Sequence, residues 1–512
     1  MTISRRIGVY LMIAAVCVTG FGLAGVFVAM RIERNARGYA IAALKKQFAS
    51  DVTMGRLHLS FFPSVRATGD DLVLRFGGRT DLPPMIKVRR FTVKGGLTGF
   101  LRYPMHIGSV ELAGLQVHIP PKQDKPESRP GSQTSEGSFI VDEVIADGAT
   151  LEVRPRDARK TPLTFELKLL RLSSAGKSTT MVFHTEVVNA LPPGAIQSDG
   201  HIGPWSTEEP GGTPVSGQYT LRNADLGVFK GIKGTLFSNG KYQGELEKIE
   251  VQGTAEVPNF TLDFAGNPTR LSTTFAATVD GKNGNTVLHP VKAVLGTSQF
   301  EVSGSIERGA IAQDKQIDLI TKSVKGELQD FIRLAVKGRP PPMTGTLAFD
   351  GKIRIPPGVT PIIAKLQLNG QFNASRVKFT SPDVQEKMAN LSHRAEADPR
   401  DHNPEVEGSM AGHFVLDTGI MSLPRLAFDL PGARVNLDGT YTLANGAINL
   451  KGTARLDATV SQMTTGIKSL LLKPVDPLFK HGDAGTVVPI AVSGKRGDPS
   501  FRLDIGRAMR RH

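Results

Sequence analysis

The chain has 512 residues, a formal net charge of +14 and one cysteine, Cys17. Disulfides, cysteine metal sites and thiol nucleophiles are therefore excluded for everything that follows residue 17. The charge gathers at the ends: residues 1–120 hold sixteen Lys and Arg against six Asp and Glu, and residues 495–512 hold six against two. A nucleic-acid binder usually spreads basic and aromatic residues through its folded domain. Basic ends around a neutral middle favour contact with anionic lipid surfaces instead, with ordinary solvated surface charge as the alternative.

A charge-free apolar run extends from Ile7 to Met30. As a helix it measures roughly 36 Å, enough to cross a bilayer core of about 30 Å. The run is too long for a cleaved signal peptide, and no small-x-small cleavage site follows it. Residues 1–30 are therefore predicted to be a cytoplasmic stub and an uncleaved transmembrane anchor. Because arginines flank both ends, a literal positive-inside count would place the bulk of the protein in the cytoplasm, while large domains can translocate regardless of charge.

Residues 31–120 are predicted to form a basic, membrane-proximal unit. Arg34 to Phe48 has the pattern of a short helix, and alternating apolar residues from Leu57 onward then indicate β-strands. Residues 121–138 lack large apolar side chains and are predicted to be a flexible linker or loop. This segment separates the basic unit from the main body.

The main body, residues 139–460, repeats the pattern apolar, polar, glycine, polar, apolar. Glycine inside a strand permits sharp bending and close approach of backbones. The pattern predicts a mainly β fold, a long antiparallel meander with one apolar, curved face. That face could be buried in a two-layer sandwich or a closed barrel, or left as a groove for a ligand. The repeated pattern occurs at Val215–Tyr219, Val251–Ala255, Val302–Ile306, Leu368–Phe372 and Leu437–Tyr441.

Three helices are expected to interrupt the strands, at residues 325–337, 383–394 and 461–473. The last of these opens the C-terminal part of the chain, residues 461–512, which ends in closing strands. It is amphipathic and basic, so it could lie on a membrane or cover one end of the sheet.

Motifs that carry chemistry are missing from the sequence. HExxH and GxSxG do not occur, and the eleven histidines lack the spacing of metal ligands. Gly176-Lys177-Ser178 ends like a phosphate-binding loop, but Arg171 stands where the leading glycine is required. We therefore expect a protein that is not an enzyme and needs no metal or cofactor.

The two ends of the chain resemble AsmA-like proteins. The resemblance lies in Val492–Asp504 (VSGKRGDPSFRLD), which follows Leu471–Phe479 (LLKPVDPLF), and in Gly55–Pro63 (GRLHLSFFP) after the predicted anchor. The family consists of bacterial inner-membrane proteins with a periplasmic bulk, related to bridge-like, chorein-type lipid transfer proteins. The resemblance implies a periplasmic body and a long, bent, taco-shaped sheet with a hydrophobic groove. About twenty strands, each about 4.8 Å apart, would give a sheet of roughly 100 Å.

The function implied by the resemblance is lipid transport and outer-membrane biogenesis, with phospholipids and the membrane surface as partners. Acyl chains would lie along inward-facing side chains, while head groups would stay in water at the open seam. The alternative is a non-enzymatic scaffold or assembly factor for outer-membrane proteins, which would hold envelope proteins at its strand edges. The side chains expected to contact acyl chains are Leu347, Phe349, Leu366, Leu368 and Phe372.

Overall fold

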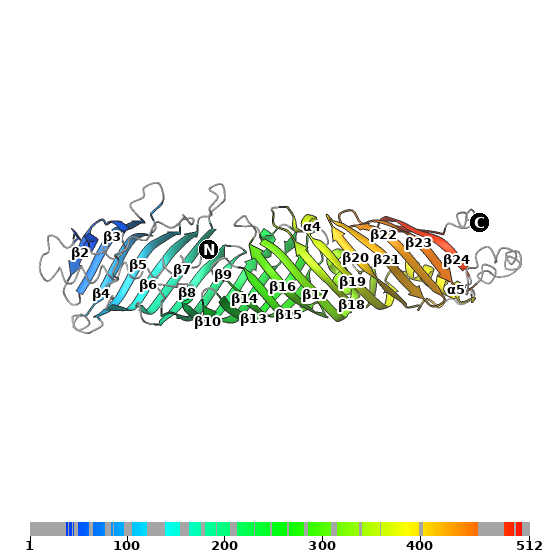
Figure 1. Ribbon diagram of the computed structural model, residues 1–512, viewed down its shortest axis with the longest axis horizontal. Helices are drawn as coiled ribbons and strands as arrows, with labels where there is room; N and C mark the ends of the chain where they lie inside the picture. The colour runs from blue at the N-terminus through cyan, green and yellow to red at the C-terminus, as the bar shows by residue number, and fades with distance from the viewer. Residues whose placement is uncertain are drawn as a thin grey trace.

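One long, curved, open sheet forms the body of the protein (Figure 1). The computed structural model describes residues 37–503 with gaps, the longest at 120–138, 154–162 and 459–485. Strand accounts for 74% of the structure, which leaves too little helix to form a second layer. The predicted mainly β class and curved antiparallel sheet are confirmed, and a sandwich of two sheets is excluded.

The first third of the sheet contains strands in which buried residues largely alternate with more exposed ones. From β3 to β25, each described strand pairs antiparallel with the next strand in the chain, except for the parallel pair β5–β6. The short strand β11 pairs with the end of β13, so β10 pairs with β12. Strands β1 and β2 both pair with β3. The strands of this third are β1 (Ser50–Thr53), β2 (Leu57–Ser60), β3 (Val65–Phe76), β4 (Ile86–Gly95), β5 (Met105–Ile119), β6 (Phe139–Val153), β7 (Leu163–Ala175) and β8 (Met181–Ala190).

The rest of the sheet continues in the same order along the long axis of the molecule (Figure 1). Its middle part holds β9 (Pro193–Ile202), β10 (Pro214–Asp225), η3 (Leu226–Val228), β11 (Ile232–Lys233), β12 (Thr235–Glu245), β13 (Lys248–Leu262), β14 (Thr269–Val279), β15 (Thr286–Leu295) and β16 (Ser298–Arg308). The last part holds β17 (Lys315–Glu327), α3 (Leu328–Ala335), β18 (Met343–Ile355), α4 (Ile362–Lys365), β19 (Gln367–Phe379), α5 (Pro382–Ala395), β20 (Gly408–Asp417), β21 (Ile420–Leu430), β22 (Ala433–Thr442), β23 (Ala447–Leu456), β24 (Thr486–Lys495) and β25 (Asp498–Leu503).

The one parallel pair joins β5 to β6, with Met105 opposite Phe139 and Ile119 opposite Val153. Parallel neighbours cannot be joined by a tight two-residue hairpin turn. The predicted linker at 121–138 lies outside the described residues. Because β5 and β6 pair along their length, the sheet is continuous between the basic unit and the main body.

A line of glycines lies where the strands bend. Gly200 is opposite Gly217, Gly240 is opposite Gly253, and Gly351 is opposite Gly370. A Cβ on Gly240 would stand 2.5 Å from the carbonyl oxygen of Gln252 and 3.0 Å from the ring of Tyr219. Glycine therefore lets neighbouring backbones approach closely, and an aromatic ring covers the bare position.

The curvature brings the two long margins of the sheet together. The loop with Gly231 follows β10 at one margin, and α4 joins β18 to β19 at the opposite margin. A Cβ on Gly231 would stand 3.4 Å from the Cβ of Ile362 in α4. Strands seven or more positions apart in the sheet thus meet across its mouth, which requires the sheet to be bent into a U in cross-section.

Two clusters of buried apolar side chains lie toward the two ends of the sheet. The first lies in the N-terminal third, where the side chains of Leu72, Leu74 and Phe91 are fully buried. The second lies between β17 and β24, where α3 and α5 cover the inner face. Residues 37–38, 40–42 and 45 are helical, and Ala40 is buried in the first cluster, in agreement with the helix predicted at 34–48.

Helices α3 and α5 confirm the predictions at 325–337 and 383–394, whereas the helix expected at 461–473 lies outside the described residues. Helix α4 was not predicted. Within the described ranges, no helix has both the length and the apolar character needed to span a membrane. The anchor predicted at 7–30 precedes the first described residue.

Candidate functional site

The inner face of β9 to β17, here called the open section, lies between the two buried clusters. We use "inner face" for the side toward which the strand glycines and apolar side chains point, and "outer face" for the polar side. The large inward side chains of the open section are only half-buried, and most belong to neither cluster. They are Ile196, Tyr219, Leu221, Tyr242, Ile249, Val251, Leu271, Phe275, Leu288, Val302, Ile306, Ile317 and Leu319.

Full burial in the open section is confined to small or branched side chains. From β10 to β17, the buried hydrophobic residues that the structure describes are Val215, Ala224, Val257, Ala277, Val291, Ala293 and Leu295. No aromatic residue is among them. The strands thus present a continuous apolar track whose larger side chains remain partly exposed.

Helix α3 borders the open section at one margin. Its Asp330 is 4% exposed and accepts hydrogen bonds from the Thr297 backbone N–H, the Thr297 hydroxyl and the Ser298 hydroxyl, each at 2.9 Å. Asn267 donates to the carbonyl oxygens of Arg333 (3.2 Å) and Val336 (2.7 Å) at the C-terminal end of the helix. These bonds satisfy the free carbonyls of the last turn. The helix is therefore fixed to two turns of the sheet margin.

An aromatic cluster marks the boundary between the open section and the C-terminal core. The ring of Phe331 in α3 lies 5.9 Å from that of Phe300 and 5.0 Å from that of Phe349, both in edge-to-face geometry. Such pairs contribute about 0.5–1.5 kcal/mol each beyond the area they bury. Phe331 thus closes the inner face at β18.

Two tyrosine–serine pairs are the polar groups at the centre of the apolar track. The Tyr242 hydroxyl lies 2.8 Å from the Ser198 hydroxyl, and the Tyr219 hydroxyl lies 3.0 Å from that of Ser238. Each serine donates to a backbone carbonyl at 2.9 Å, so each tyrosine donates to its serine. Burial raises the pKa of both phenols, which keeps them neutral. The hydroxyls satisfy each other and leave the rings as apolar surface.

The five predicted acyl-contact residues separate into two groups. Leu347 is 8% exposed and part of the C-terminal cluster, against which Phe349 and Phe372 pack. Leu368 is half-buried on β19 outside both clusters, and Leu366 ends α4 at the mouth, where its N–H donates to the Ile362 carbonyl at 2.8 Å. Three of the five therefore help to fill the C-terminal core, and two lie outside it and are partly exposed.

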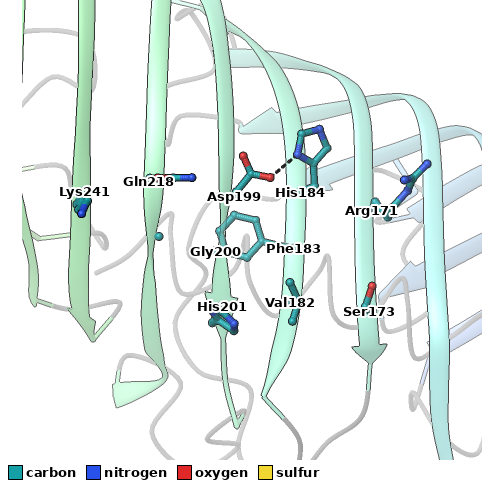
Figure 2. Close-up of a pocket in the computed structure, with 11 residues that line it drawn as sticks. Arg171, Ser173, Val182, Phe183, His184, Asp199, Gly200, His201, Gln218 and Lys241 are labelled. Carbon is teal, nitrogen blue, oxygen red and sulfur yellow. Dashed lines mark hydrogen bonds and ion pairs between the residues drawn. The ribbon is translucent and has the colours of Figure 1, made fainter.

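A shallow depression of about 420 Å³ lies on the outer face (Figure 2). Its centre is a pair formed by His184 Nδ1 and Asp199 Oδ1, 2.6 Å apart. The cross-strand neighbour of His184 on the other side is Arg171, while Ser173 is opposite Val182. The pair thus has no hydroxyl aligned with it for nucleophilic chemistry. Among the residues that the structure describes, no three His, Cys, Asp or Glu side chains are arranged to hold a metal.

The open section between β9 and β17 was not singled out by sequence reasoning. Its side chains follow the same alternation as those of the two closed ends, so periodicity gives no signal of where the inner face stays open. The glycine-centred motifs gave a partial signal, since Gly217, Gly253 and Gly304 all lie within it.

Comparison with known proteins adds no relative. No protein-family model matches the chain, and no curated protein and no solved structure is significantly similar to it. The functional argument therefore depends on the geometry of the inner face and on the sequence patterns above.

Proposed function

We propose that this chain is an inner-membrane-anchored periplasmic protein that binds phospholipid acyl chains along the open section and supports lipid movement toward the outer envelope. The observation that carries this proposal is the apolar track of β9 to β17, whose large side chains are half-buried and belong to neither buried cluster. The anchor expected at 7–30 and the AsmA-like sequence at both ends agree with it.

The energetics of acyl burial suit such a track. Each buried methylene contributes about 0.8 kcal/mol, so about ten methylenes would contribute about 8 kcal/mol before ordering costs. An apolar surface without specific polar contacts is sufficient for that gain. Head groups would remain in water between the two margins, and no cofactor or bond-breaking step is required.

Site-specific photo-crosslinking in the full chain tests this function. Benzoylphenylalanine at Leu319, which points inward, is expected to give phospholipid adducts in membranes of expressing cells. The same group at Ile320, which is 56% exposed on the outer face of the same strand, serves as the matched control. Lipid adducts at neither position, with protein adducts instead, would favour the alternative of an assembly scaffold.

A further inference from the structure

Four arginines line a second depression, on the outer face near the N-terminal end of the sheet. It measures about 770 Å³ and is formed by Arg37, Arg56, Arg89 and Arg90 together with Asp70, Asp71 and small residues. Arg37 is seven positions beyond the end of the predicted anchor. The depression thus belongs to the part of the fold that lies nearest to the membrane if the chain is anchored as proposed.

Backbone irregularities bring these side chains together. Asp71 has a φ of +53° and interrupts the pairing of β3 with β4, where Asp70 is opposite Arg90 and Leu72 is opposite Val88. One residue on each strand, Asp71 and Arg89, is thus left out of the pairing without a shift of register. The Gly55 N–H donates to the Asp70 carbonyl at 2.9 Å, which places Arg56 beside this interruption.

Two of the four guanidinium groups are left available. Arg37 donates from Nε to the Met54 carbonyl at 3.1 Å, and Arg90 Nε lies 3.2 Å from Asp70 Oδ1. The Arg89 side chain lies over Gly114. A Cβ added to Gly114 would stand 3.1 Å from the Cβ of Arg89 and 3.2 Å from the Nε of Arg89. Neither the Arg56 nor the Arg89 guanidinium group has a hydrogen-bonding or ionic partner among the described residues, so both present their donors to solvent.

We infer that this arginine depression binds the phosphate groups of anionic phospholipids at the membrane surface. Guanidinium groups pair with phosphate oxygens in a bidentate manner, and four arginines exceed the two aspartates beside them. No aromatic side chain is among the described residues that line the depression, which argues against stacked nucleic-acid bases as the ligand. The inference rests on the proposed membrane attachment, and it gives the basic end of the protein a docking role distinct from acyl-chain binding.

Hydrogen exchange of the full chain in nanodiscs tests the inference. The protein is placed in phosphatidylcholine alone or in phosphatidylcholine with one quarter phosphatidylglycerol. We expect protection of β2 and β4 that depends on phosphatidylglycerol. Arg56→Gln with Arg89→Gln should reduce that protection about tenfold, since each basic residue near an anionic surface contributes substantially to its attraction. Arg222→Gln with Arg455→Gln removes the same charge from exposed positions elsewhere and should leave it unchanged.

Other outcomes would overturn the inference. The depression does not bind anionic head groups if protection from exchange persists in the Arg56→Gln with Arg89→Gln variant. The same conclusion follows if protection is equal in both lipid mixtures. Protection produced by inorganic phosphate in phosphatidylcholine alone would assign a soluble anion instead. The Leu288→Asp with Leu319→Asp variant, which alters the inner face, should keep the phosphatidylglycerol effect. The docking site and the acyl track can therefore fail separately.

Discussion

Replacing Leu288 and Leu319 together by aspartate is expected to remove bound phospholipid from the full chain while leaving the sheet folded. The two residues lie on either side of Gly304 in neighbouring strands, toward the β17 end of the open section. Both are half-buried and belong to neither cluster, so the carboxylates would lie on the inner face and not in the packed cores. Charges there make acyl-chain burial unfavourable, because burying an ion without a partner costs several kcal/mol.

The measurement is the amount of phospholipid that remains with the purified chain after a mild detergent wash, determined by mass spectrometry. We expect a decrease of more than about tenfold, which corresponds to a loss of about 1.4 kcal/mol or more. Val287→Asp with Ile320→Asp is the matched control, since these neighbours point outward and are 50% and 56% exposed. Equal lipid content in the two double variants would contradict acyl binding at the inner face.

Substituting Gly439 by alanine is expected to cause the largest loss of stability from a single methyl group. Gly439 has a φ of +158°, and its Cβ would overlap the carbonyl oxygen of Asn449 and stand 2.8 Å from the Cα of Leu450. Strain of this kind costs about 1–3 kcal/mol, and the overlap of backbones adds to it. Strand β22 would have to separate from β23 to accommodate the methyl group.

Exchange of amide hydrogens in β22 to β24 under increasing denaturant measures this effect. Gly419→Ala is the control, because Gly419 has a φ of +76° but its Cβ would meet nothing within 4 Å. We expect Gly439→Ala to lower the local unfolding free energy by about 2 kcal/mol more than the control does. Similar losses in both variants would mean that backbone conformation alone, and not the close approach of strands, determines the need for glycine.

Much of the fold follows from local sequence patterns. The alternation of Ile86 and Val88 with Lys87 predicts a strand whose apolar side is buried, as both of these apolar residues are. The glycine-centred motifs predict a sheet that bends, because glycine permits backbones to approach. Ser381-Pro382 predicts the start of α5, since proline is suited to the first helical turn.

Other features depend on contacts that periodicity does not encode. The parallel pairing of β5 with β6 is a matter of chain path, and α4 has only four residues, too few for a helical pattern. Leu347, Phe349 and Phe372 were expected to contact lipid because they lie on the apolar side of their strands. They pack in the C-terminal cluster because α3 places Phe331 over the same face. The open section is thus a property of how far the helices extend along the sheet.

The arginine depression illustrates the same limit for charged residues. Arg56, Arg89 and Arg90 read as ordinary exposed residues of a basic unit when the sequence is taken alone. The interrupted pairing at Asp71 and the hydrogen bond between Gly55 and Asp70 bring these arginines around one depression. Aspartate tolerates a positive φ more readily than most residues do, but the sequence alone does not predict which aspartate adopts it.

Cryo-electron microscopy of the full chain in nanodiscs is the most direct test of acyl binding in the open section. The account predicts elongated density inside the sheet, within van der Waals distance of Phe275, Leu288 and Leu319 and absent from the outer face. An inner face between β9 and β17 that is filled by the protein's own side chains, with no such density, would contradict it.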